Sequence, residues 1–113
     1  MRARFDIDRL DPDDPFEIDE RNLPHLYKHL PIREGRHVPV GVEDLKDMYV
    51  VGDPIFEPAS EDGRADWIMI GEVPGLVLVV PLASSRSGDP RQCRPIGIYA
   101  ATEAERRRYL EGR

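Results

Sequence analysis

Two segments near the ends of the chain carry the side chains best suited to proton transfer and anion binding. Histidine and tyrosine can move protons, while lysine and arginine can stabilise negative charge on a phosphate. Together these groups match the needs of metal-free RNA cleavage: a base for the 2′-hydroxyl, a cation for the phosphate and an acid for the leaving oxygen. The candidates are His25, Lys28, His29, Arg94, Tyr99, Arg106, Arg107 and Arg108.

Each candidate also has a structural interpretation. A histidine such as His29 is favourable near the C-terminus of a helix, because of the helix dipole. Tyr99 could pack against a sheet, and the three consecutive arginines could form the solvated end of a helix, paired with Glu103 and Glu105. His25 fits a structural and a functional role equally well.

Metal binding is disfavoured. His25 and His29 are four positions apart and could share one metal ion with a nearby carboxylate from Glu17, Asp19 or Glu20. The sequence has no H-E-x-x-H motif and no second Cys/His pair. We therefore expect neither a metal nor another cofactor.

Composition and charge limit the possible classes of protein. A chain of 113 residues suits one domain, and no apolar run approaches the length that spans a bilayer. The formal net charge is -6, but residues 91–113 hold six arginines against three glutamates. Phosphate contacts supply most non-specific affinity for nucleic acid, so any RNA contact must be local. The single cysteine, Cys93, cannot form an internal disulfide and lacks an obvious activating neighbour apart from Arg91 and Arg94, so we expect an unreactive thiol and a cytoplasmic protein.

The candidate residues must be positioned by helices at both ends of the chain. Asn22 is a suitable cap for a first helix over residues 23–30, and apolar spacing predicts a second helix over residues 42–49. Thr102 and Glu105 form a T-x-x-E capping box that opens a final helix.

β-rich segments fill the space between these helices. Ile55 and Phe56 predict a brief strand, and two apolar runs around Pro74 and Gly75 predict a hairpin with a type II turn. A last strand is expected over residues 94–101, with Arg94 on the face opposite Tyr99. The strand over residues 76–80 is apolar on both faces, so we expect both to be covered.

These elements predict an α+β fold with an antiparallel sheet of three to five strands, two N-terminal helices and one C-terminal helix. Residues 1–15 form an acidic N-terminal extension, with Phe5 and Ile7 alternating like a short strand, and residues 16–111 form the domain.

Two motifs resemble one known family. Residues 16–29 resemble the opening F-E-x-D-E-x-N-x-x-H-h-x-[KR]-H of BrnT-type toxins, and residues 94–109 resemble the family's closing strand and helix. The resemblance implies a RelE-like fold and a type II toxin that cuts RNA as a metal-independent endoribonuclease. It also implies an antitoxin partner with a DNA-binding region. On this basis we assign catalysis to His25, Lys28, Arg94 and Tyr99, and RNA binding to His29, Arg106, Arg107 and Arg108.

One position departs from the family pattern. Relatives commonly place an arginine just ahead of the last helix, where this chain has Tyr99 followed by Ala100 and Ala101. The alternative hypothesis is therefore a BrnT-like module without catalysis, which acts through an antitoxin-like partner or by forming a homodimer.

Overall fold

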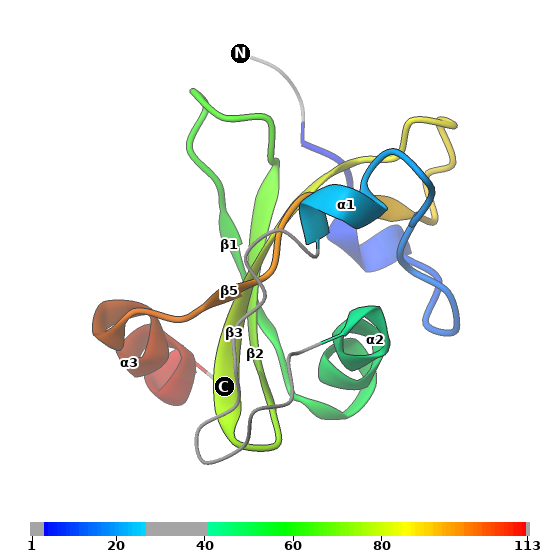
Figure 1. Ribbon diagram of the computed structural model, residues 1–113. Helices are drawn as coiled ribbons and strands as arrows, with labels where there is room; N and C mark the ends of the chain where they lie inside the picture. The colour runs from blue at the N-terminus through cyan, green and yellow to red at the C-terminus, as the bar shows by residue number, and fades with distance from the viewer. Residues whose placement is uncertain (1–3, 27–40, 113) are drawn as a thin grey trace.

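The computed structural model of the protein describes residues 4–26 and 41–112 (Figure 1). It confirms the predicted α+β class, with a five-stranded antiparallel sheet, helices before it and a helix after it. In chain order the elements are the 3-10 helix η1 (Ile7–Arg9), α1 (Leu23–Leu26), α2 (Val42–Val51), β1 (Ile55–Pro58), β2 (Trp67–Val73), β3 (Leu76–Ser84), β4 (Cys93–Pro95), β5 (Tyr99–Ala100) and α3 (Glu103–Gly112). The predicted continuation of the first helix to residue 30 lies outside the described residues.

The hairpin of β2 and β3 forms the centre of the sheet. Gly75 has a φ of 84°, the positive value that the predicted Pro-Gly turn requires. Val73 pairs with Leu76 beside this turn, and Trp67 pairs with Leu82 at the other end. The strand order is β1-β2-β3-β4, with β5 also pairing with β3.

Helices cover both faces of this hairpin, as the doubly apolar β3 predicted. Figure 1 shows α1 and α2 on one side of the sheet and α3 on the other. Leu78 and Val80 belong to the larger core, which includes Met48 of α2. Val79 belongs to a second core with Tyr109 of α3, whose hydroxyl donates a hydrogen bond of 2.7 Å to the carbonyl of Gly52.

The predicted last strand is interrupted by a bulge. Leu82 pairs with Pro95 in β4, whereas Val79 pairs with Tyr99 in β5. Between these pairs, β3 has two residues and the opposing chain has three, residues 96–98. One extra residue on one strand is a β-bulge, which shifts the register and bends the strand.

This bulge corrects the predicted orientation of two candidate residues. Arg94 pairs with Ala83, and Tyr99 pairs with Val79, which lies four residues from Ala83 on β3. Paired residues point to the same face, and residues four apart on a strand share a face. Arg94 and Tyr99 therefore project from the same face of the sheet, because the extra residue reverses the alternation.

The described part of the N-terminal extension packs onto the domain. Residues 7–9 form η1, so the predicted short strand is wrong here. Leu10 is buried in the larger core, and the Trp67 indole donates a hydrogen bond of 2.8 Å to the carbonyl of Phe5. Residues 4–15 are thus part of the folded unit.

Candidate functional site

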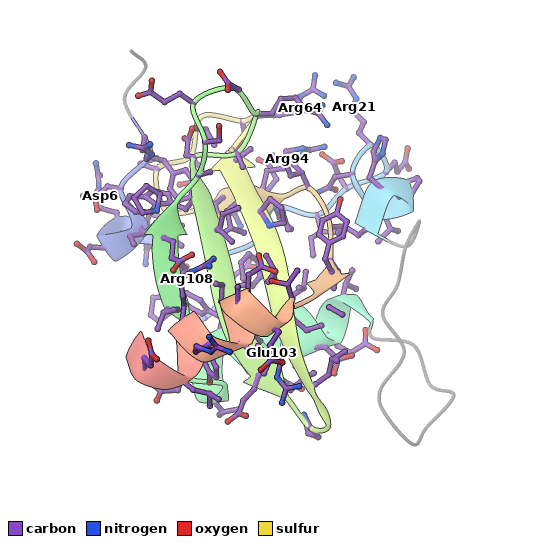
Figure 2. The ribbon with its side chains drawn as sticks, turned by 90° about the vertical axis from the view of Figure 1, so that its left-hand side faces the viewer. Asp6, Arg21, Arg64, Arg94, Glu103 and Arg108 are labelled. Carbon is purple, nitrogen blue, oxygen red and sulfur yellow. The ribbon has the colours of Figure 1, made fainter. Side chains whose placement is uncertain are left out.

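A cationic pocket lies at the end of the sheet farthest from the Pro74–Gly75 turn. This cationic pocket has a volume of about 250 Å³. Figure 2 shows Arg21, Arg64 and Arg94 gathered there, away from Arg108 on α3. Four parts of the chain line the pocket: α1 with the turn before it, the β1–β2 loop, the β3–β4 loop, and β4 with the residue that follows it. The lining residues are Arg21, Asn22, His25, Arg64, Arg86, Arg94 and Ile96.

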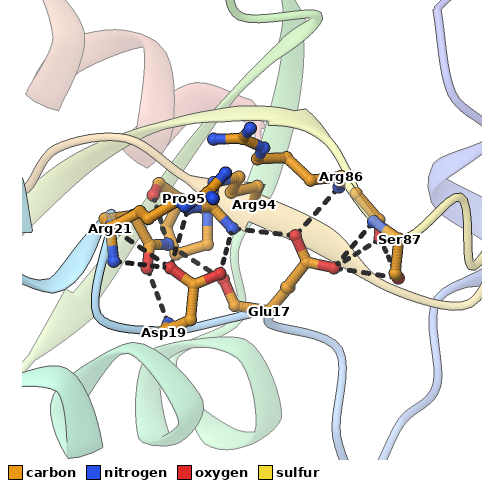
Figure 3. A network of polar contacts seen from close by, with 9 residues as sticks. Glu17, Asp19, Arg21, Arg86, Ser87, Arg94 and Pro95 are labelled. Atoms are coloured by element: carbon orange, nitrogen blue, oxygen red, sulfur yellow. Dashed lines mark hydrogen bonds and ion pairs between the residues drawn. The ribbon is translucent and has the colours of Figure 1, made fainter.

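Arg94 lies at the bottom of the pocket and is paired with two acids. Its guanidinium donates two hydrogen bonds of 2.8 Å to the two oxygens of Asp19 and one of 2.9 Å to Glu17 (Figure 3). The residue is 6% exposed. A bidentate, buried guanidinium held by two carboxylates is a structural cation. Two carboxylates face this one guanidinium, so Arg94 organises the pocket and offers little to a ligand.

Hydrogen bonds lower the pKa of both acids. Burial by itself would raise the pKa of Glu17, but hydrogen bonds from Ser85, the Arg86 amide, Arg94 and Ser87 outweigh it and lower the pKa to about 2. The hydrogen bonds from Arg94 hold the pKa of Asp19 well below its ordinary value. Both side chains are therefore anions at neutral pH, and neither can serve as a proton donor there.

Asn22 ties this network to the strand. The residue is 3% exposed, and its amide nitrogen donates hydrogen bonds to the carbonyls of Glu17 and Pro95 at 2.9 and 3.2 Å. Its side-chain oxygen accepts a hydrogen bond of 2.8 Å from the Asp19 amide. The predicted capping of the first helix is therefore replaced by a buried link between the first motif and β4.

Three arginines and one histidine supply the exposed chemistry of the pocket. Arg21, His25, Arg64 and Arg86 are all exposed. Within residues 4–26 and 41–112, none of the three arginines forms a salt bridge. Guanidinium groups recognise phosphate and carboxylate oxygens, and imidazole can transfer protons near neutral pH. The pocket can therefore bind an anion beside a proton-transfer group.

The other predicted site residues do not all converge on this pocket. Of the described candidates, only His25 and Arg94 line it. Tyr99 is 44% exposed and lies against Gly97, where an added Cβ would be 2.5 Å from its ring. Lys28 and His29 lie outside the described residues.

The arginines of α3 lie elsewhere. Arg108 forms a bidentate ion pair with Glu57 of β1, at 2.9 and 3.1 Å. Arg106 lines a separate hollow beside the hairpin turn, together with Glu72 and Leu76. Arg107 is exposed on the same helix. The expected single site containing the α1 residues and all three helix arginines is thus not what the structure shows.

The sequence contained a signal for some of the residues that were missed. Arg21 lies in the turn just before α1, so helical spacing gave no signal for its place beside His25. Arg64 and Arg86 flank the hairpin at nearly equal distances from its turn, so an antiparallel register brings them to the same end of the sheet. Counting outward from Pro74 and Gly75 would have paired these two arginines.

Three observations bear on other chemistries. In the part of the chain that the structure describes, no three His, Cys, Asp or Glu side chains group closely enough to hold a metal ion. No helix among those residues is long and apolar enough to cross a lipid bilayer. Cys93 is buried, and burial raises the pKa of its thiol to about 12, so the thiol is protonated and unreactive at neutral pH.

Comparison with known proteins adds no relative. No protein-family model, no curated protein and no solved structure matches the chain. The cationic pocket and the two sequence motifs are therefore the features of the chain that bear on its function.

Proposed function

We propose that the protein is a BrnT-like toxin component of a type II toxin–antitoxin system, an endoribonuclease that binds RNA in the cationic pocket. One observation carries this proposal. His25 shares a pocket with three arginines that are free of salt bridges to the described residues, on a chain whose net charge is -6. Such a local concentration of positive charge is the feature that an acidic protein needs to bind a phosphodiester.

The chemistry assigns one task to each kind of side chain. His25 takes the proton of the 2′-hydroxyl, whose oxygen forms a bond to phosphorus while the bond from phosphorus to the 5′-oxygen breaks. The imidazolium then returns the proton to the leaving oxygen. Arg21, Arg64 and Arg86 stabilise the charge on the phosphate oxygens. Lys28 and His29, which follow in the same segment, remain in the proposal as phosphate-binding residues.

This assignment revises the roles expected from sequence. Arg94 becomes a structural residue, since Glu17 and Asp19 occupy its guanidinium. Tyr99 is left out of the catalytic set, and the arginines of α3 are left out of the RNA-binding set, because none of them lines the cationic pocket.

The test is cleavage of a single-stranded RNA by the purified protein in EDTA. His25→Ala should lower the cleavage rate by about 100-fold, the usual contribution of a positioned acid–base group. Arg107→Ala, on α3, is the matched control and should leave the cleavage rate within about twofold of wild type. Equal losses in both variants, or unchanged cleavage by His25→Ala, would contradict the assigned site.

A second function is favoured by the departure at Tyr99 and by the engagement of Arg94. Without those two groups at a reaction centre, the same pocket could bind acidic side chains of a protein partner. The chain would then be a module without catalysis, acting through an antitoxin-like protein with a DNA-binding region or through a homodimer. Expression of the protein alone in the bacterial cytoplasm, where we place it, separates the two: growth arrest supports the nuclease and harmless expression supports the module.

A further inference from the structure

Arg86 reaches the cationic pocket from a loop without regular secondary structure. This loop joins β3 to β4, and Arg86 lies near its start. An exposed loop residue has many accessible conformations, and fixing one of them costs conformational entropy. The position of the Arg86 guanidinium therefore depends on what holds the neighbouring backbone.

Glu17 holds the loop on both sides of Arg86. One carboxylate oxygen, Oε1, accepts a hydrogen bond of 2.9 Å from the Arg86 amide and another of 2.9 Å from Arg94. The other oxygen, Oε2, accepts from the Ser85 hydroxyl at 2.6 Å and from the Ser87 hydroxyl and amide at 3.0 and 3.3 Å. Figure 3 shows Glu17 between Arg94 on one side and Ser87 on the other.

Glu17 itself is fixed from behind. Its amide donates a hydrogen bond of 2.7 Å to the carbonyl of Cys93, and Phe16 forms an isolated parallel bridge with Cys93. The Glu17 side chain is only 14% exposed. The loop is therefore attached to a rigid point on β4, and a carboxylate accepting several hydrogen bonds is among the stronger attachments available.

We infer that Glu17 is a positioning residue of the cationic pocket, which fixes the direction of Arg86 by binding its amide and the hydroxyls of the serines on either side of it. Glu17 does not contact the ligand in this arrangement. The inference rests on the proposed function only in naming RNA as the ligand; the attachment of the loop is independent of it.

The substitution Glu17→Gln separates the two oxygens. An amide offers one acceptor oxygen and one donor nitrogen, so either Ser85 and Ser87 or Arg86 and Arg94 lose their acceptor. Asp89→Asn is the matched control, because it makes the same chemical change in the same loop on a side chain that contacts the Arg91 amide instead. If Glu17→Gln does not fold, the double variant Ser85→Ala/Ser87→Ala removes the hydroxyl contacts and keeps the ion pair with Arg94.

The first measurement is native-state proteolysis with trypsin, which cleaves after arginine. Cleavage after Arg86 should become about tenfold faster in Glu17→Gln, while cleavage after Arg91, in the same loop, should keep its rate. Equal acceleration at both sites would mean general loss of stability and would overturn the inference, as would an unchanged rate after Arg86. Asp89→Asn should leave the rate after Arg86 unchanged.

The second measurement is the affinity for a short single-stranded RNA oligonucleotide. Arg86→Ala should weaken binding by about tenfold, the loss expected for one charged hydrogen-bonding contact. Glu17→Gln should weaken it by a similar factor, and the combined variant Glu17→Gln/Arg86→Ala should lose no more than Arg86→Ala alone. Additive losses would overturn the positioning role. A wild-type protein that does not bind the oligonucleotide would defeat the proposed function, and the trypsin comparison would then decide the inference about Glu17.

Discussion

The molecule carries two groups of arginines that look alike in number and differ in arrangement. Arg106, Arg107 and Arg108 are consecutive on α3, whereas Arg21, Arg64 and Arg86 come from three distant segments. Consecutive residues on a helix project about 100° apart, so the helix arginines point in different directions. The distant arginines line one pocket.

This difference shows that neighbourhood in sequence is a poor guide to convergence in space. One helix arginine, Arg108, is paired with Glu57, and another, Arg106, lies beside the hairpin turn. The pocket arginines instead surround an ion-pair network, in which the buried Arg94 contacts Glu17 and the partly exposed Asp19. Because Arg94 engages the two acids, Arg21, Arg64 and Arg86 form no salt bridge with the described residues and can contact a ligand. Four predictions test this contrast.

The largest effect is expected when Arg94, at the bottom of the cationic pocket, is replaced. Arg94→Met should lower the free energy of unfolding by about 3 kcal/mol, because it leaves the Glu17 and Asp19 charges without their cation. Arg107→Met, on an exposed helix position, should change it by no more than about 0.5 kcal/mol. Urea unfolding of the two variants measures both values, and a similar small change in each would mean that the network does not stabilise the fold.

The second-largest effect is expected from acid, which should lower the free energy of unfolding by protonating Glu17. The pKa of Glu17 is lowered on folding, so its contribution is fully present above the ordinary pKa of 4.5 and is lost as the pH falls towards about 2. Stability should drop by about 2 kcal/mol through this window. Glu17→Gln should show a flatter pH dependence than wild type, whereas Glu57→Gln, whose ion pair with Arg108 is exposed, should follow wild type closely. Denaturation midpoints between pH 5 and pH 2 decide between these outcomes.

A smaller change is expected in RNA affinity. Arg64→Ala should weaken binding by about tenfold and should reduce the slope of log affinity against log salt by about 1, as expected for one lost phosphate contact. Arg107→Ala should leave the affinity and the slope close to wild type. Titrations at several salt concentrations provide both numbers, and a larger loss for Arg107→Ala would move the RNA-binding surface to α3.

The smallest effect is expected on α3. Arg108→Ala removes the ion pair with Glu57, in which both side chains are partly exposed, and should cost about 0.5 kcal/mol. A double-mutant cycle with Glu57→Ala isolates the energy of the pair. A pair energy near the loss of about 3 kcal/mol expected for Arg94→Met would show that the two groups of arginines do not differ in the way proposed.

Local signals predicted the individual elements well. Pro74 and Gly75 closed the hairpin as expected, because proline fixes one φ and glycine accepts the positive one. The capping box also formed: the Glu105 amide donates to the Thr102 hydroxyl at 3.2 Å, and the Glu105 carboxylate accepts from the Thr102 amide at 2.8 Å. Both features involve residues at most three positions apart.

Longer-range features were predicted less well. Asn22 was expected to cap a helix, but its side-chain oxygen accepts from the Asp19 amide while its nitrogen donates to the buried carbonyl of Pro95. The last strand was expected to be continuous, and the bulge over residues 96–98 reversed the relation between Arg94 and Tyr99. Neither outcome is visible in the local pattern, because each depends on which strand lies opposite.

The sequence by itself determined the α+β class, the hairpin, the two apolar faces of β3 and the start of α3, because nearest-neighbour geometry and periodicity are enough to specify them. Tertiary structure alone decided that Arg21 joins Arg64 and Arg86 at one pocket and that Arg94 is ion-paired beneath them. Those outcomes depend on strand register, on one extra residue in a strand and on the pairing of Arg94 with acids about 75 positions away. Contacts at that separation form only when the whole chain has folded.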